Sequence, residues 1–377
     1  MTTDQVSFTA DELLASHAYA EPLVVPSLGD ALFHGGFDAS GEYVSPRTLN
    51  RWPAIKAWRA KHEAETGMPL IACPPDFFAD FYPNVKQAQY LLSEGLRDPL
   101  VQLITHIGTI EGFGAIIRHV QTDDLQRHFV DSIEGTATAH LGLGLYEAHA
   151  RDEAGYEVEG GHQQMWYGVR DLAFENPEVG DPLALVMKAF GSGNDSAGQA
   201  MQSMAKSMGG ADRVVPTIDE HMETVILRMT GLLLIELLAA NTFKWAEEVV
   251  SDDRYCANSA EAARLVDYIR RDEAPHVGYL EVTLTEMRAR TFVGEGGVRT
   301  PGTKVIDDCW NYSLLQMFGM GGKRSANRDM FVGRVEELLE GKPRRVDILA
   351  NFHDLATPDP VIEEAAPSRM AAAAPSY

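Results

Sequence analysis

A single glutamate, Glu236, lies inside an otherwise apolar run that extends from Leu232 to Ala240. The positions that share its face at helical spacing are all apolar: Met229, Leu232, Leu233, Ala239, Ala240 and Phe243. We therefore expect the Glu236 carboxylate to face the core of a helical protein. Burying a carboxylate costs free energy unless the group is paired, protonated or bound to a cation. The fold must supply one of these three solutions.

A second carboxylate follows on the next predicted helix, where Glu273 precedes His276 at the i, i+3 spacing. Apolar residues again occupy the same face, namely Val266, Ile269, Val277 and Leu280. If the chain turns near 252–258, an antiparallel helix pair places Glu236 and Glu273 at similar height. Carboxylate and neutral imidazole together suit iron or manganese. Pro275 lies between Glu273 and His276 and removes a helical hydrogen bond beside the predicted site.

The same pattern has an alternative interpretation without a metal. A buried glutamate can pair with a nearby arginine, for which Arg228 and Arg271 are the candidates, while the histidine bonds to a carbonyl oxygen. The chain would then be a non-catalytic helical bundle with a buried Glu/His network, whose acidic surface binds a partner.

The first half of the chain offers a similar but more crowded set of residues. Glu111 lies among apolar residues at helical spacing and parallels Glu236, and Glu159 precedes His162 at the i, i+3 spacing. We predict that Glu111, Glu147, Glu159 and His162 complete the site, together with Glu236, Glu273 and His276. Two further candidates remain open between these segments, Glu134 and, as an extra ligand, His140.

The apolar spacing predicts helices through most of the chain after residue 82. The expected ranges are 84–95, 98–120, 123–150, 159–175, 217–251, 259–291, 304–317 and 327–340, after one near 53–65. We expect an irregular wrapping segment over 1–82, a helix-bundle metal domain over 83–291, a helical extension over 292–355 and a disordered tail over 356–377. A Gly/Pro/Ser-rich crossover is expected over 176–216.

Composition narrows the class of protein. The net charge of −23 argues against a nucleic-acid surface or adhesion to anionic lipid. The three cysteines form no C-x-x-C pair, which fits a reducing compartment, and the N-terminus lacks the pattern of a signal peptide. We therefore expect a cytoplasmic protein without a membrane partner, and the exposed sides of long helices favour a homodimer.

Glu236 with the Glu273/His276 pair, and Glu111 or Glu147 with the Glu159/His162 pair, resemble the ferritin-like dimetal-carboxylate superfamily over roughly residues 98–291. That superfamily includes ribonucleotide reductase small subunits, bacterial multicomponent monooxygenases, acyl desaturases and arylamine N-oxygenases. The resemblance implies an all-α, antiparallel helix bundle holding two iron ions, or manganese or a mixed pair. It also implies an oxidase or oxygenase that uses dioxygen on a small organic substrate, with an electron donor that the sequence does not identify. A heme-oxygenase-like di-iron oxidase carries the same kinds of ligand.

Overall fold

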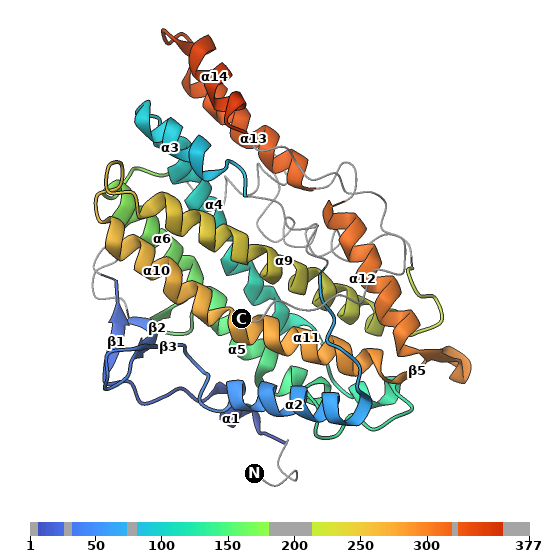
Figure 1. The fold of residues 1–377 in the computed structure, drawn as a ribbon. Coiled ribbons are helices and arrows are strands. Elements are labelled where there is room, and N and C mark those ends of the chain that lie inside the picture. Colours follow the sequence, from blue (N-terminus) through green and yellow to red (C-terminus); the bar gives the residue numbers. More distant parts are fainter. Residues whose placement is uncertain (1–6, 26–31, 74–80, 181–212, 319–322, 357–377) are drawn as a thin grey trace.

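The computed structural model describes residues 7–25, 32–73, 81–180, 213–318 and 323–356 (Figure 1). The predicted disordered tail, apart from its first residue, and most of the predicted crossover over 176–216 lie outside the described residues.

The body of the molecule is helical, as predicted. Its central helices are α4 (Asp98–Gly114), α5 (Tyr146–Ala154), α6 (His162–Phe174), α9 (Glu220–Val250), α10 (Ser259–Asp272) and α11 (Ala274–Arg288). Helix α6 packs against α4 and α10, and α9 packs against α10 and α11, so that α6, α9 and α10 run alongside one another (Figure 1). These helices bring residues far apart in the sequence together in the interior, where the buried apolar residues form two clusters.

Helix α9 forms where its sequence offers both a cap and an apolar interior. The Asp219 carboxylate accepts hydrogen bonds from the backbone N–H groups of His221 and Met222, which satisfies donors that the first helical turn leaves free. Most of the helix between these residues and Val250 is buried, and Glu236 is only 7% exposed. The expectation that this carboxylate faces the core is confirmed.

The predicted helix over 259–291 is interrupted at Glu273, where α10 ends and α11 begins. Pro275 occupies the first turn of α11, and its missing N–H cannot continue the ladder of α10. Helix α11 then ends at Arg288, and a short strand, β5 (Thr291–Val293), follows. The interruption places Glu273 at a junction between two helices, three residues before His276.

The predicted helix over 123–150 is wrong for most of its length. The structure has short single turns and a kink over Leu141–Leu145, where Leu143 and Gly144 are not helical, and regular α-helix begins only at α5. Gly144 has φ +117, and a Cβ there would lie 2.9 Å from the Leu13 Cβ, because helix α1 (Ala10–Leu14) packs against it. This close approach requires glycine and a non-helical backbone.

The expectation of an all-α protein also needs correction, because the described residues include two small sheets. In the larger one, β1 (Glu21–Val24) and β3 (Tyr43–Val44) pair antiparallel with β2 (Leu32–Phe37), and β4 (Glu159–Gly160) pairs parallel with β2. In the smaller one, β5 pairs antiparallel with β6 (Arg299–Pro301). These strands are too short to display a clear alternation of polar and apolar residues.

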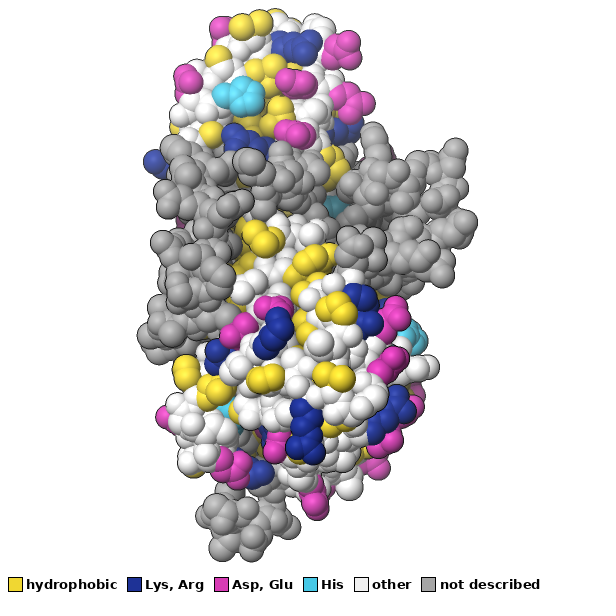
Figure 2. Space-filling view, turned by 90° about the vertical axis from the view of Figure 1, so that its right-hand side faces the viewer, with side chains coloured by type: hydrophobic (Ala, Val, Ile, Leu, Met, Phe, Trp, Pro, Cys, Tyr) yellow, Lys and Arg dark blue, Asp and Glu magenta, His cyan; other side chains and the backbone are white. Residues whose placement is uncertain are grey.

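The remaining helices cover the body at its sides and at one end. Helix α2 (Arg51–Thr66) packs on α11, and α12 (Gly302–Phe318) packs on α9 and α11. Helices α3 (Val85–Ser93), α13 (Lys323–Leu338) and α14 (Arg345–Asp354) lie together at one end (Figure 1). On the face shown in Figure 2, acidic and basic side chains are intermixed and hydrophobic side chains lie between them.

Helix α4 with the turn that follows, Asp98–His119, is long and apolar enough to cross a membrane by composition alone. Half of its most apolar window is buried inside the protein, and α4 packs against α5 and α6. Its apolar residues therefore contribute to the core.

Candidate metal centre

Seven side chains that can bind metals converge in the interior of the helical body. They form two groups of four that share Glu153: one contains Glu111, Glu153, His162 and Glu273, and the other contains His149, Glu153, Glu236 and His276. Within each group, one potential ligand atom per residue lies within 4.8 Å of the others. All seven are buried except Glu111, whose side chain is 15% exposed. The two groups are adjacent, as two neighbouring ion positions would be.

The first group joins α4, α5, α6 and the α10–α11 junction. Its centre is the Nδ1 atom of His162, which lies 2.8 Å from a Glu273 oxygen and 3.4 Å from a Glu153 oxygen. A Glu111 oxygen lies 4.0 Å from the same atom. One nitrogen and three carboxylates therefore face a common point.

The second group joins α5, α9 and α11. The Nε2 atom of His149 lies 3.4 Å from a Glu236 oxygen, and the Nδ1 atom of His276 lies 3.2 Å from a Glu153 oxygen. The His149 and His276 rings are stacked, with centroids 3.9 Å apart. Glu273 also contacts this group, because its second oxygen lies 2.6 Å from the Nδ1 atom of His276. Glu153 and Glu273 thus each lie close to histidines of both groups.

Each histidine has a polar partner on the side away from the cluster. An Asp152 oxygen lies 3.0 Å from Nε2 of His276, and an Asp272 oxygen lies 3.4 Å from Nε2 of His162. The Tyr279 hydroxyl lies 3.3 Å from Nδ1 of His149. Such partners fix the orientation and tautomer of a metal-binding histidine. In all three rings, the other nitrogen is directed at the cluster.

The crowding of buried charge shifts the pKa values of the group. Burial raises the pKa of Glu111 well above its usual range, and the charges of Glu153 and Glu273 raise it further. Burial would also raise the pKa of Glu273, but His162 and His276 outweigh this effect and lower it well below its usual range. The carboxylates therefore require compensating positive charge, which protons or cations can provide.

Burial, together with the charge on His276, lowers the pKa of His149 to about 3. Its imidazole is therefore neutral near pH 7, the form that binds metals. Burial likewise raises the pKa of Glu236 well above its usual range, with Glu273 adding to the effect.

The donor set fits a pair of metal ions. Among the described residues, both carboxylate oxygens of Glu153 and Nε2 of His149 lack a hydrogen-bond partner, although they are buried. A closed Glu/His network would satisfy these atoms, since buried polar groups are nearly always hydrogen-bonded. The four carboxylates carry four negative charges when ionised, and two divalent cations would neutralise them. Carboxylates mixed with imidazoles suit iron and manganese.

The structure brings together five of the residues selected from the sequence: Glu111, His162, Glu236, Glu273 and His276. They reach the cluster from four separate parts of the fold. The pairing of Glu236 with the Glu273/His276 segment across adjacent helices is as expected.

Glu147 and Glu159 lie outside the two groups. Glu147 lies two residues before His149 on α5, and its side chain forms ion pairs with Arg118 at 3.1 Å and Arg151 at 2.7 Å. Glu159 belongs to β4, and its side chain is 41% exposed and 3.4 Å from Arg47. Arginine partners outside the two groups account for both carboxylates.

The two other candidates also lie outside the groups. Glu134 is exposed in a turn. His140 is buried, but its two ring nitrogens contact the Phe8 backbone N–H at 3.0 Å and the Thr136 carbonyl at 2.6 Å. His140 therefore ties the N-terminal segment to the turn region.

His149 and Glu153 were missed in the sequence. They stand four positions apart on α5, which places both on one helix face. The spacing was visible, but a search for glutamate three positions before histidine does not find it, and the neighbouring Arg151 and Asp152 suggest a solvated segment. Asp152 is in fact fully buried.

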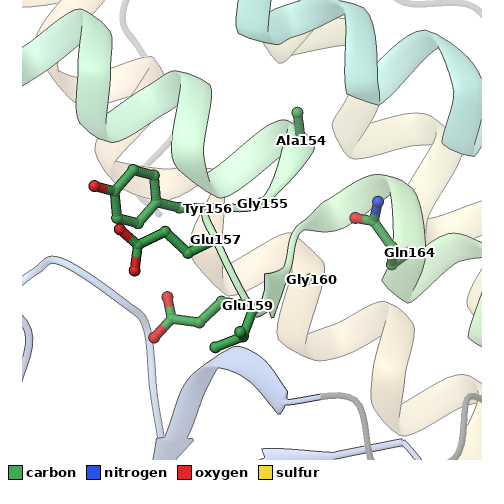
Figure 3. Close-up of a pocket in the computed structure, with 8 residues that line it drawn as sticks. Ala154, Gly155, Tyr156, Glu157, Glu159, Gly160 and Gln164 are labelled. Atoms are coloured by element: carbon green, nitrogen blue, oxygen red, sulfur yellow. The ribbon is translucent and has the colours of Figure 1, made fainter.

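A pocket of about 410 Å³ lies beside the turn that connects Glu153 to His162 (Figure 3). It is lined by Ala154, Gly155, Tyr156, Glu157, Val158, Glu159, Gly160 and Gln164. In Figure 3 the side chains of Tyr156, Glu157 and Glu159 lie on one side of the turn, away from Gln164. The pocket contains none of the seven cluster residues, so it lies on the outer side of the turn.

Comparison of the chain with protein-family models, with curated proteins and with solved structures gives no significant match.

Proposed function

We propose that the protein is a non-heme dimetal oxidoreductase that uses dioxygen to oxidise a small organic substrate. The observation that supports this most directly is the buried set of four carboxylates and three imidazoles, with Glu153 and Glu273 placed between two positions. Iron is the metal we propose, with manganese or a mixed pair as the alternatives, because both accept this donor set.

The residues divide into three roles on this proposal. Glu111 and His162 would hold one ion, and His149, Glu236 and His276 would hold the other. Glu153 and Glu273 would contact both, since each approaches histidines of both groups.

The residues around the cluster orient its ligands and exclude water. Asp152, Asp272 and Tyr279 contact the outer ring nitrogens, which fixes the direction of the inner ones. Glu111 is the most exposed of the seven side chains, so this side of the site is the one nearest to solvent. The low exposure of the others limits the access of bulk water.

When bound, a redox-active metal pair would supply the capacity to exchange electrons with dioxygen. In an oxygenase, dioxygen accepts two electrons from the substrate and two from an external reductant. One oxygen atom then enters the product and the other leaves as water. This balance requires a separate electron donor.

Metal content is the decisive first measurement. We expect protein produced with iron and manganese available to contain about two ions per chain by elemental analysis, as a complete dimetal site requires. Glu236→Ala and His276→Ala should each lose bound metal, because each removes a proposed ligand. Glu147→Gln is the matched control, since its carboxylate belongs to α5 but pairs with surface arginines.

A folded wild-type protein that contains no metal would refute the proposal, and the Glu/His cluster would then be a structural network. If Glu147→Gln also loses its metal, the loss in Glu236→Ala and His276→Ala cannot be assigned to removal of a ligand. If metal is retained only in the wild type and the control, substrate screening under dioxygen becomes the next step.

A further inference from the structure

Both aspartates that contact the cluster histidines are held by one short N-terminal segment, 43–51. This segment comprises strand β3, the turn that follows and the first residue of α2. It belongs to the part of the chain that the sequence suggested was only a wrapping segment. Its contacts lead directly to the candidate metal centre.

Asp152 is held by two arginines of the segment. Nε of Arg47 donates a hydrogen bond to one Asp152 oxygen at 2.8 Å, and an Arg51 nitrogen donates to the other at 2.7 Å. All three side chains are buried. The Asp152 oxygen bound by Arg51 also lies 3.0 Å from Nε2 of His276. The two arginines therefore hold Asp152 in a defined position against His276.

Asp272 is held by Tyr43, whose hydroxyl lies 2.9 and 2.8 Å from the two carboxylate oxygens. The Tyr43 ring stacks on Tyr268, with centroids 4.2 Å apart and an angle of 14° between planes. A Cβ at Gly35 would lie 2.3 Å from the Tyr43 hydroxyl, so strand β2 must carry glycine beside it. Contacts with Asp272, the Tyr268 ring and Gly35 together restrict the position of the Tyr43 side chain.

The same sheet also holds the backbone between two cluster residues. Strand β2 pairs in parallel with β4, which lies in the turn between Glu153 and His162. The N-terminal sheet therefore supports this turn while the 43–51 segment supports both aspartates.

We propose that the 43–51 segment is a positioning element for both metal ions. Tyr43 acts through Asp272 on His162, and Arg47 and Arg51 act through Asp152 on His276. The inference rests on the proposed dimetal function, because it concerns the affinity of the two ions. Removal of a group that bonds directly to a metal-binding histidine, as Asp272 and Asp152 do, typically changes the metal affinity by roughly 10–100-fold.

Tyr43→Phe tests the proposal because it removes one hydroxyl and keeps the stacked ring. Cobalt(II) serves as the probe, with binding followed by its absorption spectrum and affinity measured by competition with a chelator. We expect the ion on the His162 side to bind more weakly, by up to roughly tenfold because Tyr43 acts through Asp272, and the other ion to be unchanged. Tyr268→Phe is the matched control, since it removes a hydroxyl from the stacked ring but leaves the Tyr43–Asp272 contact in place.

A double-mutant cycle then tests whether Tyr43 acts through Asp272. Adding Tyr43→Phe to Asp272→Asn should cost little further affinity, because the group through which the hydroxyl acts has already changed. Arg47→Gln should weaken the other ion, and Arg47→Lys should restore part of that affinity by restoring the charge.

Several results would overturn the proposal. Unchanged affinity for both ions in folded Tyr43→Phe would refute the positioning role while leaving the dimetal site intact. An equal loss of cobalt(II) affinity in Tyr268→Phe would contradict the positioning role. So would a double variant in which the affinity losses of Tyr43→Phe and Asp272→Asn simply add. Either result would mean that the substitutions only destabilise the protein in general. A wild-type protein that binds no cobalt would refute both the positioning role and the dimetal site.

Discussion

At the scale of single residues, the two proposed ion positions depend most on Glu153, the member shared by both groups. We predict that Glu153→Gln abolishes the binding of both ions, because a neutral amide cannot replace a carboxylate between two cations. Glu111→Gln should remove or weaken only one ion, since Glu111 belongs to one group. Elemental analysis and a cobalt(II) titration distinguish the two outcomes. Equal stoichiometry in both variants would contradict the shared role of Glu153.

Glu281 provides a residue-scale prediction that is independent of metal. It is 7% exposed on α11, burial raises its pKa to about 7, and its Arg59 partner at 3.6 Å only partly opposes this. Well below the ordinary glutamate pKa of about 4.5, Glu281 is protonated in both the folded and the unfolded chain, so its ionisation does not change the free energy of unfolding there. As the pH rises from about 4.5 to about 7, the unfolded chain loses the proton first, and Glu281 therefore increasingly destabilises the fold.

We accordingly predict that Glu281→Gln stabilises the protein, with a gain that grows by roughly 2 kcal/mol between pH 5 and pH 8. Denaturant unfolding of the variant and the wild type at both pH values measures the change. Glu94→Gln is a suitable control, because its carboxylate pairs with Arg344 near the surface. A difference between Glu281→Gln and the wild type that does not vary with pH would contradict the prediction.

The sequence identified cluster residues in two ways, by a charge within an apolar run and by the spacing of glutamate three positions before histidine. Glu111 and Glu236 could be found because a charge within an apolar helix face has few explanations. His149 and Glu153 could not, because charged neighbours surround them, and the partners that bury Asp152 come from residues 47 and 51. Burial produced by distant segments leaves no local pattern.

At the scale of elements, the turn between α5 and α6 determines the relative positions of Glu153 and His162. Gly155 has φ +84, and a Cβ there would lie 2.3 Å from the Glu159 carbonyl oxygen. A Cβ at Gly161 would lie 2.3 Å from the Gly155 nitrogen. Backbone atoms cannot move aside cheaply, so both positions require glycine.

We predict that Gly161→Ala costs more than about 2 kcal/mol of stability and reduces metal occupancy, because the turn must open. Gly67→Ala is the control, since Gly67 has positive φ but faces open space, and it should cost only about 1 kcal/mol. Denaturant unfolding and elemental analysis provide the two measurements. Equal costs at the two glycines would contradict the importance of the turn.

Long elements with extended apolar sequences were predictable, as α4 and α9 show. The interruption at Glu273 was not, although Pro275 was recognised, because a proline can either bend a helix or end it. The sheet was also missed, since its strands pair residues that lie far apart, such as Phe33 with Gly160. Pairing of this kind depends on tertiary structure.

At the scale of the whole molecule, the candidate centre lies where the chain passes between two apolar clusters. On α4, Ile107 belongs to one cluster and Ile117, just beyond the helix, to the other, with Glu111 between them. On α9, Leu237 and Phe243 likewise belong to different clusters, and Glu236 lies at this boundary. The polar centre therefore interrupts the core at one level across several helices.

This location predicts that metal binding stabilises the entire fold. The proposed ligands come from α4, α5, α6, α9, the α10–α11 junction and α11, so bound ions would link segments that otherwise repel one another through buried carboxylates. Binding to the folded state alone adds about 4 kcal/mol per ion when free metal exceeds the dissociation constant a thousandfold. We therefore expect the unfolding midpoint to rise with metal concentration and to fall on addition of chelator. His276→Ala should lose most of this dependence, whereas Glu147→Gln should keep it. If the unfolding midpoint of the wild type changes with neither metal nor chelator, the prediction is wrong. Protonation of the buried carboxylates alone would then compensate their charge.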